Sequence, residues 1–244
     1  MRPLSAAVLL DVWERGQPLP PARQALLLLA AACPEQAAEE LLRMPVGRRD
    51  DRLLSLRALT FGETLGGSVS CPRCHELLEF AMPANALRAT SPAEDAPAAA
   101  VVVEEGDYRV RLRLPTTDDL LVLLTSDAAT GEDLLRRCLL EASLADAPLE
   151  PELLPLSLVA ASAEALEAAD PQAHVTLALS CAACGHHWDS PFDIVSFCWT
   201  EIDRWAKQTL RDVHWMASAY GWAEAEILAL SAWRRASYLS LIHG

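Results

Sequence analysis

Long apolar runs are missing from the 244-residue sequence. The longest covers residues 25–32 and is well short of the roughly 18 residues that a membrane-spanning helix requires. A cleavable signal peptide is not expected either, because Asp11 and Glu14 interrupt the short apolar stretch that follows Arg2. These two absences predict a cytoplasmic protein with no segment inserted in a membrane.

Recognisable catalytic sequences are equally scarce. The chain contains no H-E-x-x-H, G-x-S-x-G or G-x-x-x-x-G-K sequence and no glycine-rich dinucleotide-binding loop. With only 10 glycines, few segments resemble the loops that build an active site. His174, His214 and His243 form no recognisable pairing with a nucleophile. We therefore expect a binding or scaffold protein rather than an enzyme.

Positive charge is scarce as well. The chain has 20 basic residues, of which Lys207 is the single lysine, against 34 acidic residues, so its formal net charge is −14. Binding to a phosphate backbone requires a positively charged surface, so this balance disfavours nucleic acid as a partner. Residues 71–170 contain 7 basic and 19 acidic residues, a net charge of −12. The acidity therefore belongs to the middle of the chain.

Four of the seven cysteines form two C-x-x-C pairs. Cys71 and Cys74 make the first pair, and Cys181 and Cys184 make the second. A tight turn with this spacing directs two thiolates at one tetrahedral ion about 2.3 Å away, and two such turns complete a four-thiolate zinc site. A disulfide framework is not expected in a cytoplasmic protein, because thiols stay reduced there. The sequence predicts one structural zinc ion, since four protein thiolates leave no position for a catalytic water.

Other interpretations of the four cysteines stay open at this stage. A rubredoxin-like iron site uses the same four sulfurs, so spacing alone does not separate iron from zinc. A redox dithiol is less well supported, because neither pair follows a strand and opens a helix. The two pairs can also be unrelated, and His75, His186 and His187 lie beside them as competing ligands. The three remaining cysteines lie in apolar helical segments and are expected to be buried small hydrophobes: Cys33, Cys138 and Cys198.

Alternating apolar residues flank both pairs. Leu177 and Leu179 precede Cys181, and Leu78 and Phe80 follow Cys74, a period of two that predicts strands with one apolar face. Each pair therefore lies in a strand–turn–strand unit, as in a zinc ribbon. Because 106 residues separate Cys74 from Cys181, a whole subdomain is expected between the two halves.

The predicted fold is α+β and mostly α-helical, with a split four-cysteine zinc ribbon, a large inserted subdomain and a long C-terminal helix. Its expected parts, in chain order, are an N-terminal helical layer, a first zinc knuckle, an Ala/Pro linker, an inserted hairpin-plus-helices subdomain, a second zinc knuckle and a C-terminal helical segment. They cover residues 1–65, 66–83, 84–99, 100–173, 174–193 and 194–244. Glycine and proline divide the first part into expected helices over residues 4–14, 21–32, 35–43 and 46–61.

The inserted subdomain is expected to begin with a hairpin that turns through Gly106. Arg109, Arg111 and Arg113 share one face of its second strand. Three arginines in a row can contact nucleic acid, but with 19 acidic residues in the same segment they are expected to pair with carboxylates.

Helices are expected to complete this subdomain. Thr116 and Asp119 have the spacing of a capping box for a helix over residues 117–126. Two further helices are expected over residues 131–144 and 151–169.

The longest helix is expected over residues 194–220, because Asp193 suits its N-cap and Gly221 its C-terminal end. Trp215 falls on the polar side of this helix, so it contacts either a partner protein or the N-terminal helices. The tryptophan-rich tail that follows forms either a core or a docking surface. The candidate partner-binding residues are Trp215, Trp222 and Trp233.

Several segments together resemble a known family. They are residues 59–62 and the Cys71 to Cys74 knuckle, residues 112–116, the long helix after Cys184-Gly185, and the ending Tyr220-Gly221-Trp222-x-Glu224-x-Glu226-Ile227-Leu228. Over residues 40–82 and 108–242, the chain is similar to baseplate hub and hub-assembly proteins of T-even-type contractile phage tails and of phage-tail-like contractile injection systems. Two features depart from that pattern without removing a thiolate: His75 stands where a glycine often follows the first knuckle, and the linker at residues 84–99 is long.

The resemblance implies a non-enzymatic component that either sits in a baseplate or helps to assemble it. Its implied partners are hub, spike or tape-measure proteins, and its implied location is the cytoplasm or a tail-like particle. Independently, the acidic insertion suits a basic surface on a partner. The alternative function is that of a stand-alone zinc-ribbon regulatory protein that binds nucleic acid.

Overall fold

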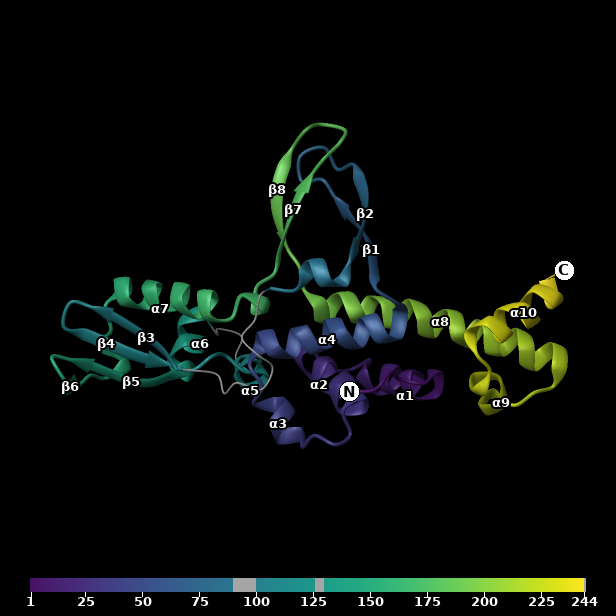
Figure 1. The fold of residues 1–244 in the computed structure, drawn as a ribbon, viewed down its shortest axis with the longest axis horizontal. Helices are drawn as coiled ribbons and strands as arrows, with labels where there is room; N and C mark the ends of the chain where they lie inside the picture. Colours follow the sequence, from purple (N-terminus) through teal and green to yellow (C-terminus); the bar gives the residue numbers. More distant parts are fainter. Residues whose placement is uncertain (90–99, 126–129, 244) are drawn as a thin grey trace.

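The computed structural model describes residues 1–89, 100–125 and 130–243. Helices cover 56% of the chain and the longest is α8 (Ile194–Tyr220), so the mostly helical composition and the long C-terminal helix are confirmed. Figure 1 shows an elongated molecule with a central helical body. A lobe lies at one end of this body, a helical tail lies at the other, and two hairpins project from one side.

The helical body combines the N-terminal helices with the first half of α8. These helices are α1 (Ala6–Gly16), α2 (Pro21–Ala32), α3 (Ala38–Leu42) and α4 (Val46–Phe61). Their apolar faces meet in one core, where Leu28, Leu29, Leu53 and Leu54 are at most 1% exposed. Each such side chain contributes about 1.5–3 kcal/mol when it leaves water, so this core anchors the rest of the fold.

The two ends of α8 are those predicted from the sequence. The carboxylate of Asp193 accepts the N–H of Val195 at 2.9 Å, which satisfies one of the unpaired donors of the first turn. Gly221 ends the helix in the left-handed conformation with φ of 69°, which glycine adopts without steric cost.

A buried ion pair joins α4 to α8. The guanidinium of Arg57 donates two hydrogen bonds to the carboxylate of Glu201, at 2.8 and 2.7 Å, and a third to the carbonyl of Gly62 at 2.7 Å. The Arg57 side chain is only 3% exposed, and its bonds to Glu201 raise the pKa of Arg57. A two-pronged contact of this kind fixes both distance and angle between its partners. It therefore sets the position from which the chain leaves α4 for the first hairpin.

The projecting hairpins confirm the two strand–turn–strand units. The first consists of β1 (Thr64–Ser70) and β2 (Leu77–Pro83), and the second of β7 (Thr176–Ser180) and β8 (His187–Pro191). Burial alternates along β2, β7 and β8 as the sequence pattern predicted. Within the described ranges each hairpin is a separate two-stranded antiparallel sheet, and the two stand beside each other on the helical body (Figure 1).

The lobe contains a four-stranded antiparallel sheet in the order β3-β4-β5-β6. Its strands are β3 (Val101–Glu105), β4 (Tyr108–Leu112), β5 (Leu139–Leu144) and β6 (Ala147–Pro148), and its helices are α5 (Thr117–Leu123), α6 (Gly131–Cys138) and α7 (Leu156–Ala169). Val110 and Leu112 on β4 pack with Leu135 of α6 and Leu158 of α7 in a second core. The lobe therefore has its own interior.

The prediction of one helix over residues 131–144 is wrong. The helix ends at Cys138, and residues 139–144 form β5, which pairs with β4. Glu141 lies opposite Arg111 in this pairing, and the two form an ion pair at 2.8 Å. The stabilising partner of β5 is about 30 residues away in sequence, so a local apolar pattern does not reveal it.

The predicted pairing of the hairpin arginines with carboxylates is confirmed. Each finds an acidic partner within the lobe, at 3.3, 2.8 and 2.6 Å: Arg109 with Glu104, Arg111 with Glu141 and Arg113 with Asp119. The capping box of Thr116 and Asp119 is also present at the start of α5. Part of the expected helix over 117–126 lies outside the described residues.

The lobe meets the helical body at the N-terminus of α4. The N–H of Val46 donates to the carbonyl of Pro115, and the N–H of Gly47 donates to the carboxylate of Asp170, both at 2.9 Å. A Cβ on residue 47 would lie 1.8 Å from an oxygen of Asp170, so only glycine permits this contact.

Asp50, on the next turn of α4, makes the stability of the protein depend on pH. Burial raises the pKa of Asp50 from 3.8 to about 6, although neighbouring Arg49 lowers it. The folded chain therefore takes up this proton at a higher pH than the unfolded chain. Asp50 should make the folded state more stable by about 2 kcal/mol as pH falls from 6 to 4.

This dependence is measured by urea unfolding of wild type and Asp50→Asn between pH 4 and 7. The difference in stability between the two proteins should change across that window. Asp11→Asn, at an exposed site on α1, is the control and should run parallel to wild type. A parallel profile for Asp50→Asn would refute the assignment.

The segment expected as an Ala/Pro linker, residues 84–99, begins inside the core. Residues 84–87 form the 3₁₀ turn η1 (Ala84–Leu87), in which Ala84 and Leu87 are 2% and 4% exposed. Its first residues therefore belong to the helical body, and residues 90–99 lie outside the described part of the chain.

The tail folds back on the end of α8. It contains α9 (Glu224–Ala229) and α10 (Ala232–His243), and Ile227 packs with Val213 and Met216 in a third, small core. Of the helices in the described ranges, none combines the length and apolarity needed to cross a bilayer.

Candidate metal centre

The two C-x-x-C turns share one backbone pattern. In the first, the N–H of Cys71 donates to the carbonyl of Glu76 and the N–H of His75 donates to the carbonyl of Cys71, both at 2.9 Å. In the second, the N–H of Cys181 donates to the carbonyl of His186 at 2.9 Å and that of Gly185 to Cys181 at 2.8 Å. The chain therefore builds the same turn twice, at the tip of each hairpin.

Both turns require a residue with positive φ directly after the second cysteine. His75 has φ of 63° and Gly185 has φ of 68°. This conformation costs an L-residue roughly 1–2 kcal/mol, a cost that glycine avoids in the second turn and that His75 bears in the first.

We expect His75→Gly to raise the free energy of unfolding by about 0.5–1 kcal/mol, after the greater flexibility of unfolded glycine is subtracted. Gly185→Ala should lower it by about 1–2 kcal/mol. No atom lies within 4 Å of a Cβ at Gly185, so that change tests backbone strain alone. Urea unfolding of the two variants checks both signs, and a loss of stability in His75→Gly would show that its imidazole matters more than its backbone.

The four paired cysteines come together in space. Their sulfur atoms all lie within 4.8 Å of one another, although the pairs are 106 residues apart. Across the two hairpins, the Sγ atoms of Cys71 and Cys184 are 3.7 Å apart and those of Cys74 and Cys181 are 3.6 Å apart. A tetrahedral zinc site with bonds of about 2.3 Å has sulfurs about 3.8 Å apart, whereas a disulfide bond is about 2.05 Å long. The arrangement fits a shared metal ion and excludes disulfides.

The thiols influence one another strongly. Burial raises the pKa of Cys71, but hydrogen bonds from the backbone N–H groups of Cys74 and Arg73 outweigh it and lower that pKa to about 7. For Cys74, the N–H of Glu76 lowers the pKa, yet the neighbouring thiols and burial together raise it to about 12. One thiolate therefore opposes ionisation of the next, and a cation among the four sulfurs would remove that opposition.

The three nearby histidines lie outside this ligand group, which among the described residues consists of the four cysteines alone. The ring of His186 stacks on that of Trp188, with centroids 5.8 Å apart and planes 8° apart. His75 and His187 are exposed. A shell of four thiolates is closed, which suits a structural ion rather than a catalytic one.

The other three cysteines are buried, as predicted: Cys33, Cys138 and Cys198 are at most 4% exposed. Burial raises the pKa of Cys138 to about 11 and also raises the pKa of Cys198. The thiols of Cys138 and Cys198 are therefore neutral, and all three cysteines are core side chains.

The three candidate tryptophans lie in different environments near the C-terminus. Trp215 is 47% exposed on α8, and Trp233 is 78% exposed on α10. Trp222 is partly buried, and its ring lies 4.8 Å from that of Tyr220 and 5.0 Å from that of Tyr238. Trp222 thus packs within the tail, whereas Trp215 and Trp233 present surface to solvent.

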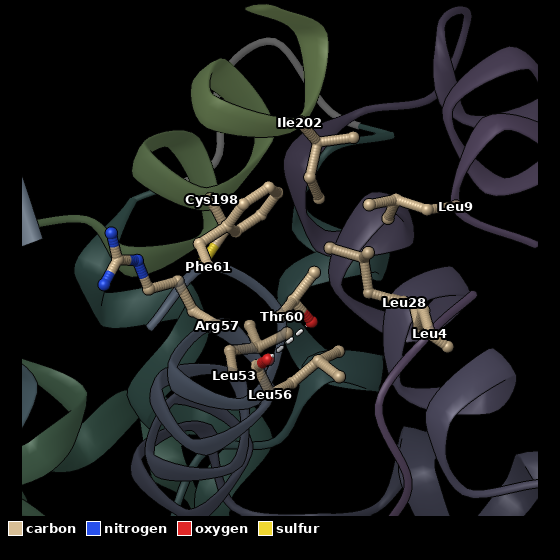
Figure 2. Close-up of a pocket in the computed structure, with 10 residues that line it drawn as sticks. All are labelled: Leu4, Leu9, Leu28, Leu53, Leu56, Arg57, Thr60, Phe61, Cys198 and Ile202. Carbon is tan, nitrogen blue, oxygen red and sulfur yellow. Dashed lines mark hydrogen bonds between the residues drawn. The ribbon is translucent and has the colours of Figure 1, made fainter. Parts of the chain in front are cut away.

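The helical body contains one small pocket, shown in Figure 2. It has a volume of about 10 Å³, which is close to the space that a single water molecule needs. Its ten lining residues are Leu4, Leu9, Leu28, Leu53, Leu56, Arg57, Thr60, Phe61, Cys198 and Ile202. The hydroxyl proton of Thr60 is already used in a hydrogen bond, because it is donated to the carbonyl of Leu56 at 2.8 Å. The pocket is a packing defect of the core and not a substrate site.

The sequence does not predict the cleft that lies between the two hairpins. The hairpins and the start of α8 enclose an open cleft of about 390 Å³. The alternation of Leu177 and Leu179 was visible in the sequence, but nothing local shows that their strand faces β1 across a gap.

The chain was compared with protein-family models, with curated proteins and with solved structures. A family model described as T4 bacteriophage base plate protein matches residues 20–199. The matched range contains most of the helical body, both cysteine pairs and the whole lobe. Comparison with curated proteins and with solved structures returns no match.

Proposed function

Because the chain belongs to the T4 bacteriophage base plate protein family, we propose that it is a non-enzymatic structural or assembly component of a baseplate in a phage-tail-like contractile injection system. The observation that carries this proposal is the family match over residues 20–199. Membership in that family supports a structural role among other baseplate proteins. The proposed partners are hub, spike or tape-measure proteins.

A structural zinc ion completes the proposed role. Its support is the group of four cysteine sulfurs, all within 4.8 Å of one another. Two of them belong to the hairpin that precedes the lobe in sequence, and two belong to the hairpin that follows it. Binding of zinc to such a site contributes about 10–16 kcal/mol at neutral pH, enough to hold two otherwise separate hairpins together. Metal analysis of the purified chain should find about one zinc per molecule. Iron with a coloured thiolate absorption band, or no metal, would reject zinc.

The absence of catalysis is part of the proposal. A closed thiolate shell offers no position for an activated water. The small pocket of the helical body is lined almost entirely by apolar side chains. Neither feature supplies a nucleophile and a base beside a substrate-sized space.

The surface of the molecule suggests how it contacts its partners. Residues 100–173, which include the lobe, contain 15 acidic and 5 basic residues, and Trp215 and Trp233 are exposed toward the other end of the molecule. We propose the lobe for a basic surface on a neighbouring protein and the tryptophans for an apolar contact.

Deletion of the gene in its native system tests the baseplate role. Electron microscopy should then show no complete sheathed particles, and the wild-type gene should restore them. Normal contractile particles in the deletion strain would overturn the role. Mass spectrometry of purified particles would show whether the protein stays in the mature baseplate or acts during assembly only.

A further inference from the structure

One wall of the cleft between the hairpins is formed by strand β1. Four consecutive residues of β1, Gly66 to Val69, line it, whereas β2 contributes only Phe80. Within the described ranges β1 pairs with β2 alone, so the other edge of β1 carries unpaired N–H and C=O groups. Such an edge accepts an extended segment from another chain.

Two of the β1 residues that line the cleft, Gly66 and Gly67, have no side chain. Phe80 lies directly across Gly67, where a Cβ would be 2.6 Å from the ring, and at Gly66 the nearest atom to a Cβ is 3.8 Å away. No side chain therefore rises from the middle of β1 to block an approaching backbone.

Apolar side chains line the opposite wall and part of the floor. Leu177 and Leu179 of β7 and Phe192 line the cleft, together with Phe197 from the first turn of α8. Leu177 and Leu179 are two residues apart and face the same way, which matches the spacing of alternate side chains on an added strand. The cleft therefore suits an extended segment whose apolar residues alternate.

One charge at the floor is left for a partner. Asp193 is occupied by the N–H of Val195 and the hydroxyl of Ser196, and Glu201 pairs with Arg57. Arg204 also lines the cleft and is exposed, and no carboxylate of the described residues lies within ion-pair distance of it. An acidic residue of the bound segment would complement Arg204.

We propose that this cleft binds an extended segment of a partner protein by adding it to the free edge of β1. Alternate apolar side chains of the segment pack against Leu177 and Leu179, and an acidic side chain pairs with Arg204. The inference deepens the proposed function, on which it rests only in taking the partner to be another baseplate protein.

The test begins with a random heptapeptide library displayed on yeast and selected against the full chain. The selected peptides should show alternating apolar residues and one Asp or Glu near an end. Their affinity is then measured with synthetic, fluorescently labelled peptides. We expect Leu179→Asp to weaken binding at least about tenfold, because it places a charge against the apolar side chains of the peptide. Leu77→Asp, on the outer face of the first hairpin with Leu77 62% exposed, is the matched control and should bind normally.

A charge exchange decides the case if Leu179→Asp disturbs the hairpin. Arg204→Glu changes only an exposed side chain and should weaken binding about fivefold. Replacing the acidic residue of the peptide with lysine should then restore binding to the Arg204→Glu protein. The proposal is overturned if no alternating sequence is selected, or if neither Arg204→Glu nor the reversed peptide changes affinity. Because no baseplate protein is used, this failure is distinct from a failure of the proposed function, which the deletion strain reports.

Discussion

Replacing Cys184 with serine should lower the free energy of unfolding of the whole chain by roughly 4 kcal/mol or more. Cys184 belongs to the second hairpin, and its sulfur lies 3.7 Å from that of Cys71 in the first. Serine is a poor ligand for a soft thiolate-preferring ion, so the site would lose affinity as well as one ligand. The effect should reach beyond the hairpins, because β1 continues directly from α4 and β8 leads directly into α8. Helix loss and hairpin loss should therefore occur together.

Urea unfolding followed by circular dichroism measures this effect, and metal analysis of the same sample should show zinc below one equivalent. Ala183→Ser is the matched control, since Ala183 is exposed in the same turn and all four thiols remain. A chelator should reproduce the Cys184→Ser result in wild type. Unchanged melting of Cys184→Ser would show that the four cysteines carry no structural metal.

Replacing Asp119 with asparagine should cost about 3–5 kcal/mol, the range typical of breaking a buried ion pair from one side. The Asp119 side chain is 0% exposed. It accepts two hydrogen bonds from Arg113, at 2.6 and 2.8 Å, and one from Arg137 at 3.1 Å. It also accepts the N–H and the hydroxyl of Thr116, at 2.9 and 2.7 Å. Asparagine would leave the guanidinium of Arg113 without its counter-ion, would leave Arg137 with the more distant Asp118, and would weaken the cap of α5.

The pKa of Asp119 supports the size of this effect. Burial alone would raise it, but the hydrogen bonds from Arg113 and Thr116 outweigh burial and hold the pKa far below its usual value. The stabilisation is therefore fully present above about pH 4 and is lost as pH falls further. This is the opposite direction from Asp50.

The control for Asp119→Asn is its neighbour on the same turn. Asp118 is 48% exposed and lies 3.8 Å from Arg137, so Asp118→Asn should cost no more than about 1 kcal/mol. Urea unfolding at pH 7 compares the two variants. Equal costs for both would mean that the buried network contributes no more than an ordinary surface pair.

The elements predicted correctly from the sequence depend on short-range chemistry. Each C-x-x-C turn is defined by four consecutive residues. Asp193 caps the N-terminus of α8 and Gly221 ends the same helix. The capping box of Thr116 and Asp119 is likewise complete within four positions. In each case the relevant contacts are local, so the sequence contains them.

The errors and omissions concern contacts between distant residues. The sequence predicts residues 139–144 as the end of a helix, because the strand that pairs with them, β4, lies about 30 residues earlier. The hydrogen bond between the backbone N–H of Gly47 and the carboxylate of Asp170 joins positions 123 apart, and no sequence motif predicts it. The position of the four sulfurs relative to each other could be predicted from metal chemistry, whereas the cleft below them could not, because it depends on how two hairpins are held above α8.

The two connections between the lobe and the helical body lie close together. Gln172 receives the N–H of Ala89 at 2.7 Å and donates to the carbonyl of Leu87 at 3.2 Å, so the chain enters and leaves the lobe at neighbouring points. A change of length between these points, away from Pro115 and Asp170, which contact α4, would therefore leave the cysteines and the helices of the body in place. A lobe of a different size is therefore physically compatible with the same helical body and the same group of four cysteines.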